Sequence, residues 1–151
     1  MSGTPQYDGT LSFLIEALRD YLPVAWRIRC RLSITLPDGQ HVPDFAIVRG
    51  LKREFLTRHP CPADIGIVGE VADASILYEQ RAKAHIYARF AIPVYWIINL
   101  QDQRIEVHSQ PSGPTAEPKY NVIANYTLGD VVPLDLKDYT VTEIPTDNLL
   151  P

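Results

Sequence analysis

Cysteine is scarce in this chain, which has 151 residues and only two cysteines, Cys30 and Cys61. They form no CxxC motif of the kind used in metal or redox sites, and they are too few for a disulfide scaffold. We therefore expect free thiols in a reducing compartment and a cytoplasmic location.

Long apolar runs and a targeting segment are also missing. No stretch approaches the roughly 20 apolar residues that span a bilayer, and residues 1–7 lack the basic start and apolar run of a signal peptide. We expect no membrane association. The 46% of hydrophobic residues suffice for one sizeable core. This predicts a single domain over residues 1–151, with residues 1–8 and 140–151 loosely packed.

Common catalytic motifs are absent as well. The chain has no G-x-S-x-G, no P-loop and no G-x-G-x-x-G, so acyl transfer, nucleotide hydrolysis and nicotinamide chemistry have no support. Its four histidines lack the spacing of zinc ligands. The formal charge of −4 is unfavourable for nucleic-acid binding, which depends on clustered Lys and Arg. Two short basic clusters, at residues 27–31 and 52–53, are typical of solvated faces, although the local field matters more than the net charge.

Hydrophobic periodicity predicts the order of the secondary structure. One helix is expected over residues 10–22, with Thr10 as N-cap and Pro23 as stop, and a second from residue 76 or 77 to 90. Strands are expected over residues 25–36, 43–48, 64–71, 94–100, 103–108, 120–126 and 131–136. This pattern predicts an α/β fold with a central mixed β-sheet flanked by helices.

One acidic residue is unusual because of its surroundings. Glu70 lies in the most apolar strand of the chain, where an unpaired carboxylate would cost several kcal/mol, so something must compensate its charge. Strand alternation places Glu70 on the face of Val68, and Asp44 on the face of Ala46 and Val48. Small neighbours leave room beside both carboxylates.

The second predicted helix supplies a cation to the same region. Five residues of this helix form one stripe at spacings of three and four, namely Ile76, Gln80, Lys83, Tyr87 and Phe90. A helix that follows the Glu70 strand must pack back across the sheet, so Lys83 can reach toward the carboxylates. Two acids on neighbouring strands with one lysine are typical of a site for a hard cation such as Mg²⁺. The alternatives are a strand-start role for Asp44 and a buried structural ion pair between Glu70 and Lys83.

At these residues the chain resembles the Uma family of restriction endonucleases, a branch of the PD-(D/E)XK nuclease superfamily. The resemblance runs over about residues 34–133 and rests on three segments and on single positions in the second helix. The segments are PDFAIVRG at 43–50, DIGIVGEVADAS at 64–75 and AIPVYWIINL at 91–100. The helix positions are Tyr78-Glu79, Lys83 and Tyr87-Ala88.

The resemblance implies a restriction endonuclease-like fold and a defined site. Catalytic residues are implied at Asp44, Glu70 and Lys83, and metal ligands at Asp44, Glu70 and Val71. The lysine of the parent superfamily, two residues after the glutamate, would fall at Ala72; the similar family places it on the helix, where Lys83 matches. The implied activity is Mg²⁺- or Mn²⁺-dependent hydrolysis of DNA phosphodiesters, with a homodimer as a further expectation. The alternative is a nuclease-fold module that binds nucleic acid or a protein partner without cutting.

Four further residues are candidates for substrate contacts, each with a simpler reading. Glu16 could join the metal site from the first helix or lie on a solvated face. Asp73, together with Ser75, could simply cap the second helix. Tyr78 and Gln80 could touch substrate or only pack.

Overall fold

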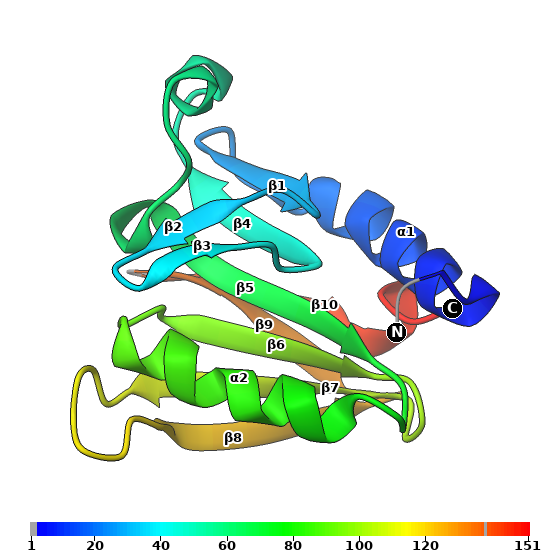
Figure 1. Cartoon of the computed structure of the whole chain (residues 1–151). Helices are drawn as coiled ribbons and strands as arrows, with labels where there is room; N and C mark the ends of the chain where they lie inside the picture. Colours follow the sequence, from blue (N-terminus) through cyan, green and yellow to red (C-terminus); the bar gives the residue numbers. More distant parts are fainter. Residues whose placement is uncertain (1–2, 138) are drawn as a thin grey trace.

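The computed structural model describes residues 3–137 and 139–151 and is centred on a six-stranded sheet with the order β1-β4-β5-β6-β7-β8 (Figure 1). Its strands are β1 (Trp26–Cys30), β4 (Phe45–Arg49), β5 (Ile65–Ala72), β6 (Val94–Asn99), β7 (Arg104–Pro111) and β8 (Tyr120–Thr127). Strands β5 and β6 run parallel, whereas the other neighbours in this sheet pair antiparallel. The expected central mixed sheet is confirmed.

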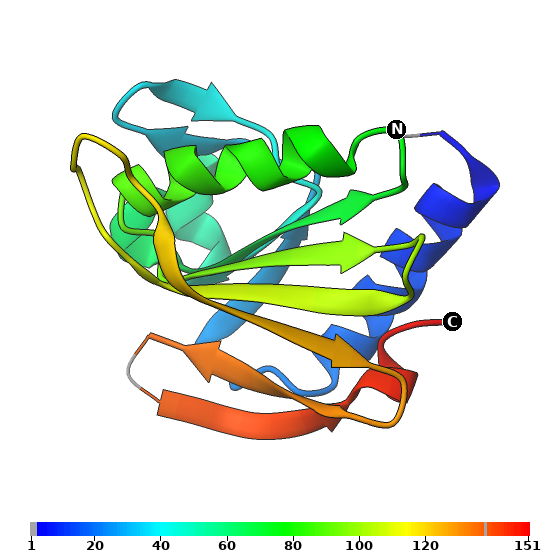
Figure 2. The ribbon, with the colours of Figure 1, turned by 90° about the horizontal axis from the view of Figure 1, so that it is seen from below.

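The sheet is covered on both faces. Helix α2 (Leu77–Arg89) connects the parallel strands β5 and β6 and packs on one face with the hairpin of β2 (Ile34–Leu36) and β3 (Gly39–His41). Helix α1 (Pro5–Arg19) and the hairpin of β9 (Val131–Leu136) and β10 (Tyr139–Pro145) pack on the other face. Figure 2 shows α2 and the β9–β10 hairpin on opposite sides of the sheet.

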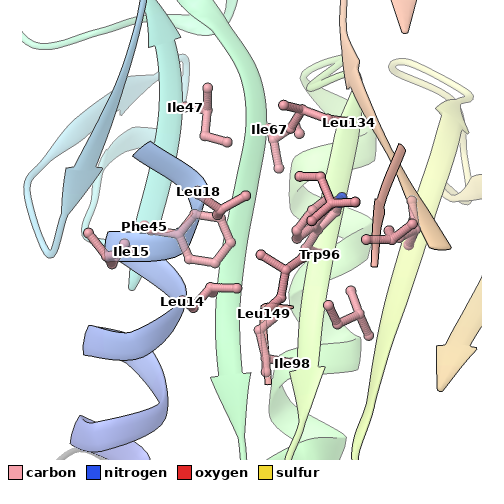
Figure 3. Packing of buried hydrophobic residues seen from close by; sticks show 14 of the residues in the cluster. Leu14, Ile15, Leu18, Phe45, Ile47, Ile67, Trp96, Ile98, Leu134 and Leu149 are labelled. Atoms are coloured by element: carbon pink, nitrogen blue, oxygen red, sulfur yellow. The ribbon is translucent and has the colours of Figure 1, made fainter. Parts of the chain in front are cut away.

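The larger core lies on the α1 face of the sheet. Leu14 and Leu18 of α1 point at Phe45 and Trp96, and Leu149 fills the space beside them (Figure 3). All five side chains are fully buried or nearly so. Burial of this much apolar surface fixes α1 against β4, β5 and β6, at about 25 cal/mol per Å² removed from water. No helix in the described residues has the length and apolar character needed to cross a bilayer.

Helix α1 begins earlier than predicted. Thr4 is its N-cap, since the Thr4 side chain accepts a hydrogen bond from the Tyr7 amide, and Pro5 occupies the first turn. The predicted cap, Thr10, is wrong: this residue is buried inside the helix. The apolar periodicity starts at Leu11, and a cap with an adjacent proline outside that periodic stretch decides where the helix starts.

Two other expectations need correction. The predicted strand over residues 25–36 is broken, because Arg31 adopts a left-handed conformation (φ 52°) between β1 and β2. The C-terminal segment, expected to pack loosely over residues 140–151, contributes β10 and the fully buried Ile144 and Leu149. The N-terminal segment likewise buries Tyr7. The C-terminal segment contains several prolines, but its apolar residues still pack into the core on the α1 face of the sheet.

Gly69 allows β4 and β5 to approach as they do. It pairs with Phe45 across the two strands, and a Cβ atom at Gly69 would lie 2.0 Å from Phe45 Cζ. We expect Gly69→Ala to lower the free energy of unfolding by about 1–3 kcal/mol, because the buried Phe45 ring would have to move. Urea unfolding followed by circular dichroism measures this change.

Gly9→Ala is the matched control, since it adds the same methyl group to open space in α1. This control should gain up to about 1 kcal/mol from the better helix propensity of alanine. Equal unfolding midpoints for the Gly69 variant and the wild type would show that the Phe45 ring does not need this space.

Candidate functional site

Asp44 and Glu70 are brought together by the pairing of β4 with β5. Asp44 directly precedes β4, and the register of Phe45 with Gly69 makes it the cross-strand neighbour of Glu70. The Asp44 amide donates a hydrogen bond to Glu70 Oε1 at 3.1 Å. Both residues are buried, with 7% and 2% of their surface exposed. The predicted proximity of the two acids is therefore present in the structure.

Lys83 approaches the same site from α2. Its Nζ atom lies 3.1 Å from Glu70 Oε2, and the Tyr87 hydroxyl donates to the same oxygen at 3.2 Å. The inward direction predicted from the helical stripe is confirmed. The Lys83 side chain keeps 41% of its surface exposed, so its ammonium lies at the rim of the site. A molecule arriving from solvent could therefore contact this amine.

Asp44 has partners that the sequence pattern does not reveal. The Val71 amide donates to Asp44 Oδ2 at 2.8 Å, and the Tyr7 hydroxyl donates to the same oxygen. Arg31 Nε lies 3.8 Å from Asp44 Oδ1. Tyr7 and Arg31 are distant from Asp44 in sequence and reach it only through tertiary packing. These contacts hold the Asp44 carboxylate in one orientation.

Burial and mutual repulsion perturb the titration of this site. Burial, opposed by Lys83 and assisted by the nearby Asp44 carboxylate, raises the pKa of Glu70 to about 7. Burial and the neighbouring carboxylates also raise the pKa values of Tyr7 and Tyr87, so both phenols remain hydrogen-bond donors at neutral pH. Lys83 therefore compensates only part of the buried negative charge, and a further cation would stabilise the ionised pair.

The donor set fits a hard divalent cation. Carboxylate oxygens of Asp44 and Glu70 and the backbone oxygen of Val71 are hard ligands, and Mg²⁺ commonly uses one or two carboxylates while keeping several waters. Gln80 Nε2 donates to the Val71 carbonyl oxygen at 3.2 Å and so fixes its orientation. Within residues 3–137 and 139–151 no cluster of three or more His, Cys, Asp or Glu residues could hold a metal ion.

The other predicted contact residues lie at different depths. Gln80 is buried and supports Val71, whereas 84% of the Tyr78 surface is exposed. Asp73 Oδ1 accepts hydrogen bonds from the amides of Ser75 and Ile76 in the turn before α2. Glu16 lies on the exposed side of α1. Roles in substrate binding stay predictions for all four residues.

Comparisons with known proteins identify the fold and the family of this chain. The protein resembles a solved structure described as "a putative nuclease belonging to DUF820 from Anabaena variabilis ATCC 29413", with a TM-score of 0.68 and 13% sequence identity. That match covers 97% of this chain and 81% of the other, and at this identity it shows the shared fold alone. Among curated proteins none matches the chain. A family model described as "Uma2: Putative restriction endonuclease" matches residues 1–141. Because this match spans nearly the whole sequence, the chain belongs to the Uma2 family.

Proposed function

We propose that this protein is a Mg²⁺- or Mn²⁺-dependent endonuclease that hydrolyses phosphodiester bonds of DNA. The observation that carries the proposal is the buried pair of Asp44 and Glu70 with the Lys83 ammonium 3.1 Å from Glu70. Membership of the Uma2 family supports the same class of activity. A buried pair of carboxylates is costly to maintain, and binding a divalent ion would offset that cost.

The roles of the residues follow from their contacts. Asp44, Glu70 and the Val71 carbonyl would hold the ion, which when bound supplies an activated water and neutralises charge on the scissile phosphate. Tyr7 and the Val71 amide keep Asp44 oriented, and Gln80 orients the Val71 carbonyl. Lys83, at the exposed rim, would orient the attacking water or stabilise charge on the phosphate as a cation. A preorganised donor of this kind contributes most where water is partly excluded.

Cleavage assays test this proposal through Lys83. The wild type should nick supercoiled plasmid with Mg²⁺ or Mn²⁺ and should not do so in EDTA. We expect Lys83→Met to lower the cleavage rate by about 100-fold or more, as loss of one charge-stabilising donor does. Lys119→Met is the matched control, because it removes an exposed lysine from the loop before β8.

A protein that binds DNA without cutting it would show a different pattern. The wild type and Lys83→Met would then give the same background nicking, independent of the divalent ion, while a gel-shift assay still detected binding. That result would favour the alternative function of a non-cleaving binding module. A homodimer and a cytoplasmic location stay predictions, and light scattering tests the first.

A further inference from the structure

A groove of about 680 Å³ follows the outer edge of β1. It lies between the residues at the C-terminal end of α1 and η1, the short 3-10 helix Lys52–Leu56. Strand β1 is the last strand on its side of the sheet and lies beside α1 (Figure 1). The groove is therefore open to solvent along an unpaired strand edge.

The groove concentrates positive charge in a chain whose net charge is −4. Its cationic lining residues are Arg19, Arg27, Arg29 and Lys52. No aspartate or glutamate lines the groove within the described part of the chain, and none of the four cations has an ion pair there. The local field in this groove therefore favours an anionic ligand.

Arg29 is the cation with the strongest need for such a ligand. Its Nε atom is buried without a hydrogen-bond partner among the described residues. Its guanidinium stacks 5.3 Å from the centre of the Phe55 ring, and burial lowers the pKa of Arg29. A partly desolvated guanidinium is stabilised when an anion pairs with it, and phosphate matches its donor geometry.

The remaining walls of the groove are apolar. Val24 is fully exposed there, and 49% of the Leu32 surface is exposed. Phe55 adds an aromatic ring to the same lining, with the guanidinium groups of Arg29 and Arg58 5.3 and 5.2 Å from its centre. Unpaired nucleic-acid strands bind in basic grooves where bases contact aromatic and apolar side chains, whereas a duplex keeps its bases stacked inside. This combination favours an unpaired strand over a duplex.

A second hollow, of about 320 Å³, adjoins the groove and shares Arg19 and Cys30 with it. Unlike the groove, this hollow is lined by two acids, Asp8 and Glu16, as well as by Arg31. Arg31 Nε in turn lies 3.8 Å from Asp44 Oδ1. Arg31 is also paired with Asp8 at 3.0 Å, so the positive charge that is open to a ligand lies in the groove itself.

We propose that this groove binds a single-stranded segment of DNA, with its phosphates at Arg27, Arg29 and Lys52 and its bases against the apolar wall. The inference rests on the proposed nuclease function for the reaction at Asp44 and Glu70. It adds the form of the substrate.

Fluorescence anisotropy with a labelled 12-nucleotide oligo(dT) tests the groove without cleavage, since the titrations run in EDTA. The wild type should bind oligo(dT) more tightly than a duplex of equal length. The double variant Arg29→Met/Lys52→Met should bind at least about 10-fold more weakly and show a shallower salt dependence, by about 0.7 in slope per lost phosphate contact. Arg89→Met/Lys119→Met is the matched control, because it removes the same charge from exposed positions outside the groove.

Each outcome decides for or against the groove. Equal weakening by the two double variants would mean that net charge alone drives binding, and tighter binding of the duplex would reject the unpaired strand. Lys52→Met alone removes an exposed lysine and should still weaken binding if the Arg29 variant fails to fold. Groove-dependent binding without any metal-dependent nicking would contradict the nuclease proposal and leave the groove assignment intact. Metal-dependent nicking by a protein whose oligo(dT) affinity is unchanged by these substitutions would contradict the groove assignment and support the nuclease proposal.

Discussion

Glu70→Gln is expected to abolish metal-dependent cleavage and, in the same protein, to remove a pH-dependent loss of stability. Removing a proposed metal ligand should lower the rate by more than about 100-fold, since even residues that only orient ligands contribute about 10–100-fold. In EDTA the folded wild type holds the Glu70 proton up to a pKa of about 7, above the ordinary value of 4.5. The folded state therefore binds more protons than the unfolded state, so stability falls as the pH rises through this window.

The expected loss for the metal-free wild type between pH 5 and pH 8 is on the order of 3 kcal/mol, at 1.36 kcal/mol per pKa unit. Glutamine resembles the protonated glutamate, so the variant should show little change over this range. Urea unfolding at both pH values measures the difference, and plasmid nicking measures the activity. If the free energy of unfolding of Glu70→Gln followed the same pH profile as that of the wild type, a group other than Glu70 would cause the pH dependence.

Glu106→Gln should destabilise the protein. Glu106 contacts Arg81 of α2 and lies outside the proposed active site. Glu106 lies on β7 with only 2% of its surface exposed. Arg81 holds it through two hydrogen bonds, of 3.2 and 2.5 Å, and Asn99 donates a third at 3.2 Å. Burial alone would raise the pKa of Glu106, but the His108 ring 3.5 Å away and the hydrogen bonds from Arg81 and Asn99 lower it to about 2. We therefore expect the neutral glutamine to cost on the order of 3 kcal/mol at pH 7.

The pH dependence of the Glu106 effect has the opposite sign to that of Glu70. A carboxyl group with a lowered pKa stabilises the fold above its ordinary value of 4.5, and this contribution disappears as the pH falls toward 2. The difference between wild type and Glu106→Gln should therefore narrow from pH 5 to pH 3 in urea unfolding. Glu117→Gln, in an exposed loop, is the control. A constant difference across this range would exclude the charge as its source.

The parts of the fold that were predicted well are those whose hydrophobic pattern lies within one continuous segment of the sequence. Strand β6 and helix α2 lie within about a residue of their expected bounds, because buried strands and amphipathic helices impose their own periodicity on the sequence. Glu70 and Lys83 were predictable for the same reason. One is a charge inside an apolar strand, and the other is a lysine on the inward stripe of a helix.

The parts that were missed depend on contacts between distant residues or on one backbone conformation. Tyr7 and Arg31 meet Asp44 only after α1 and β1 have packed on β4, and no local pattern marks either residue. The break between β1 and β2 occurs at Arg31, which has a positive φ. A positive φ is usually predicted from a glycine, and none is present at this position. The partners of Glu106 come from α2 and from the last residue of β6, so hydrophobic periodicity does not reveal this cluster either.

The hydrogen bond from Tyr7 to Asp44 ties the first helix to residues that enter the fold much later along the chain. A nascent or locally unfolded chain in which α1 has not docked would leave Asp44 without the Tyr7 hydroxyl that orients it. We expect such a molecule to have little of the proposed activity. Extensions fused ahead of Thr4 should likewise be chosen with care, because they join the chain within one helical turn of Tyr7, whose hydroxyl orients Asp44.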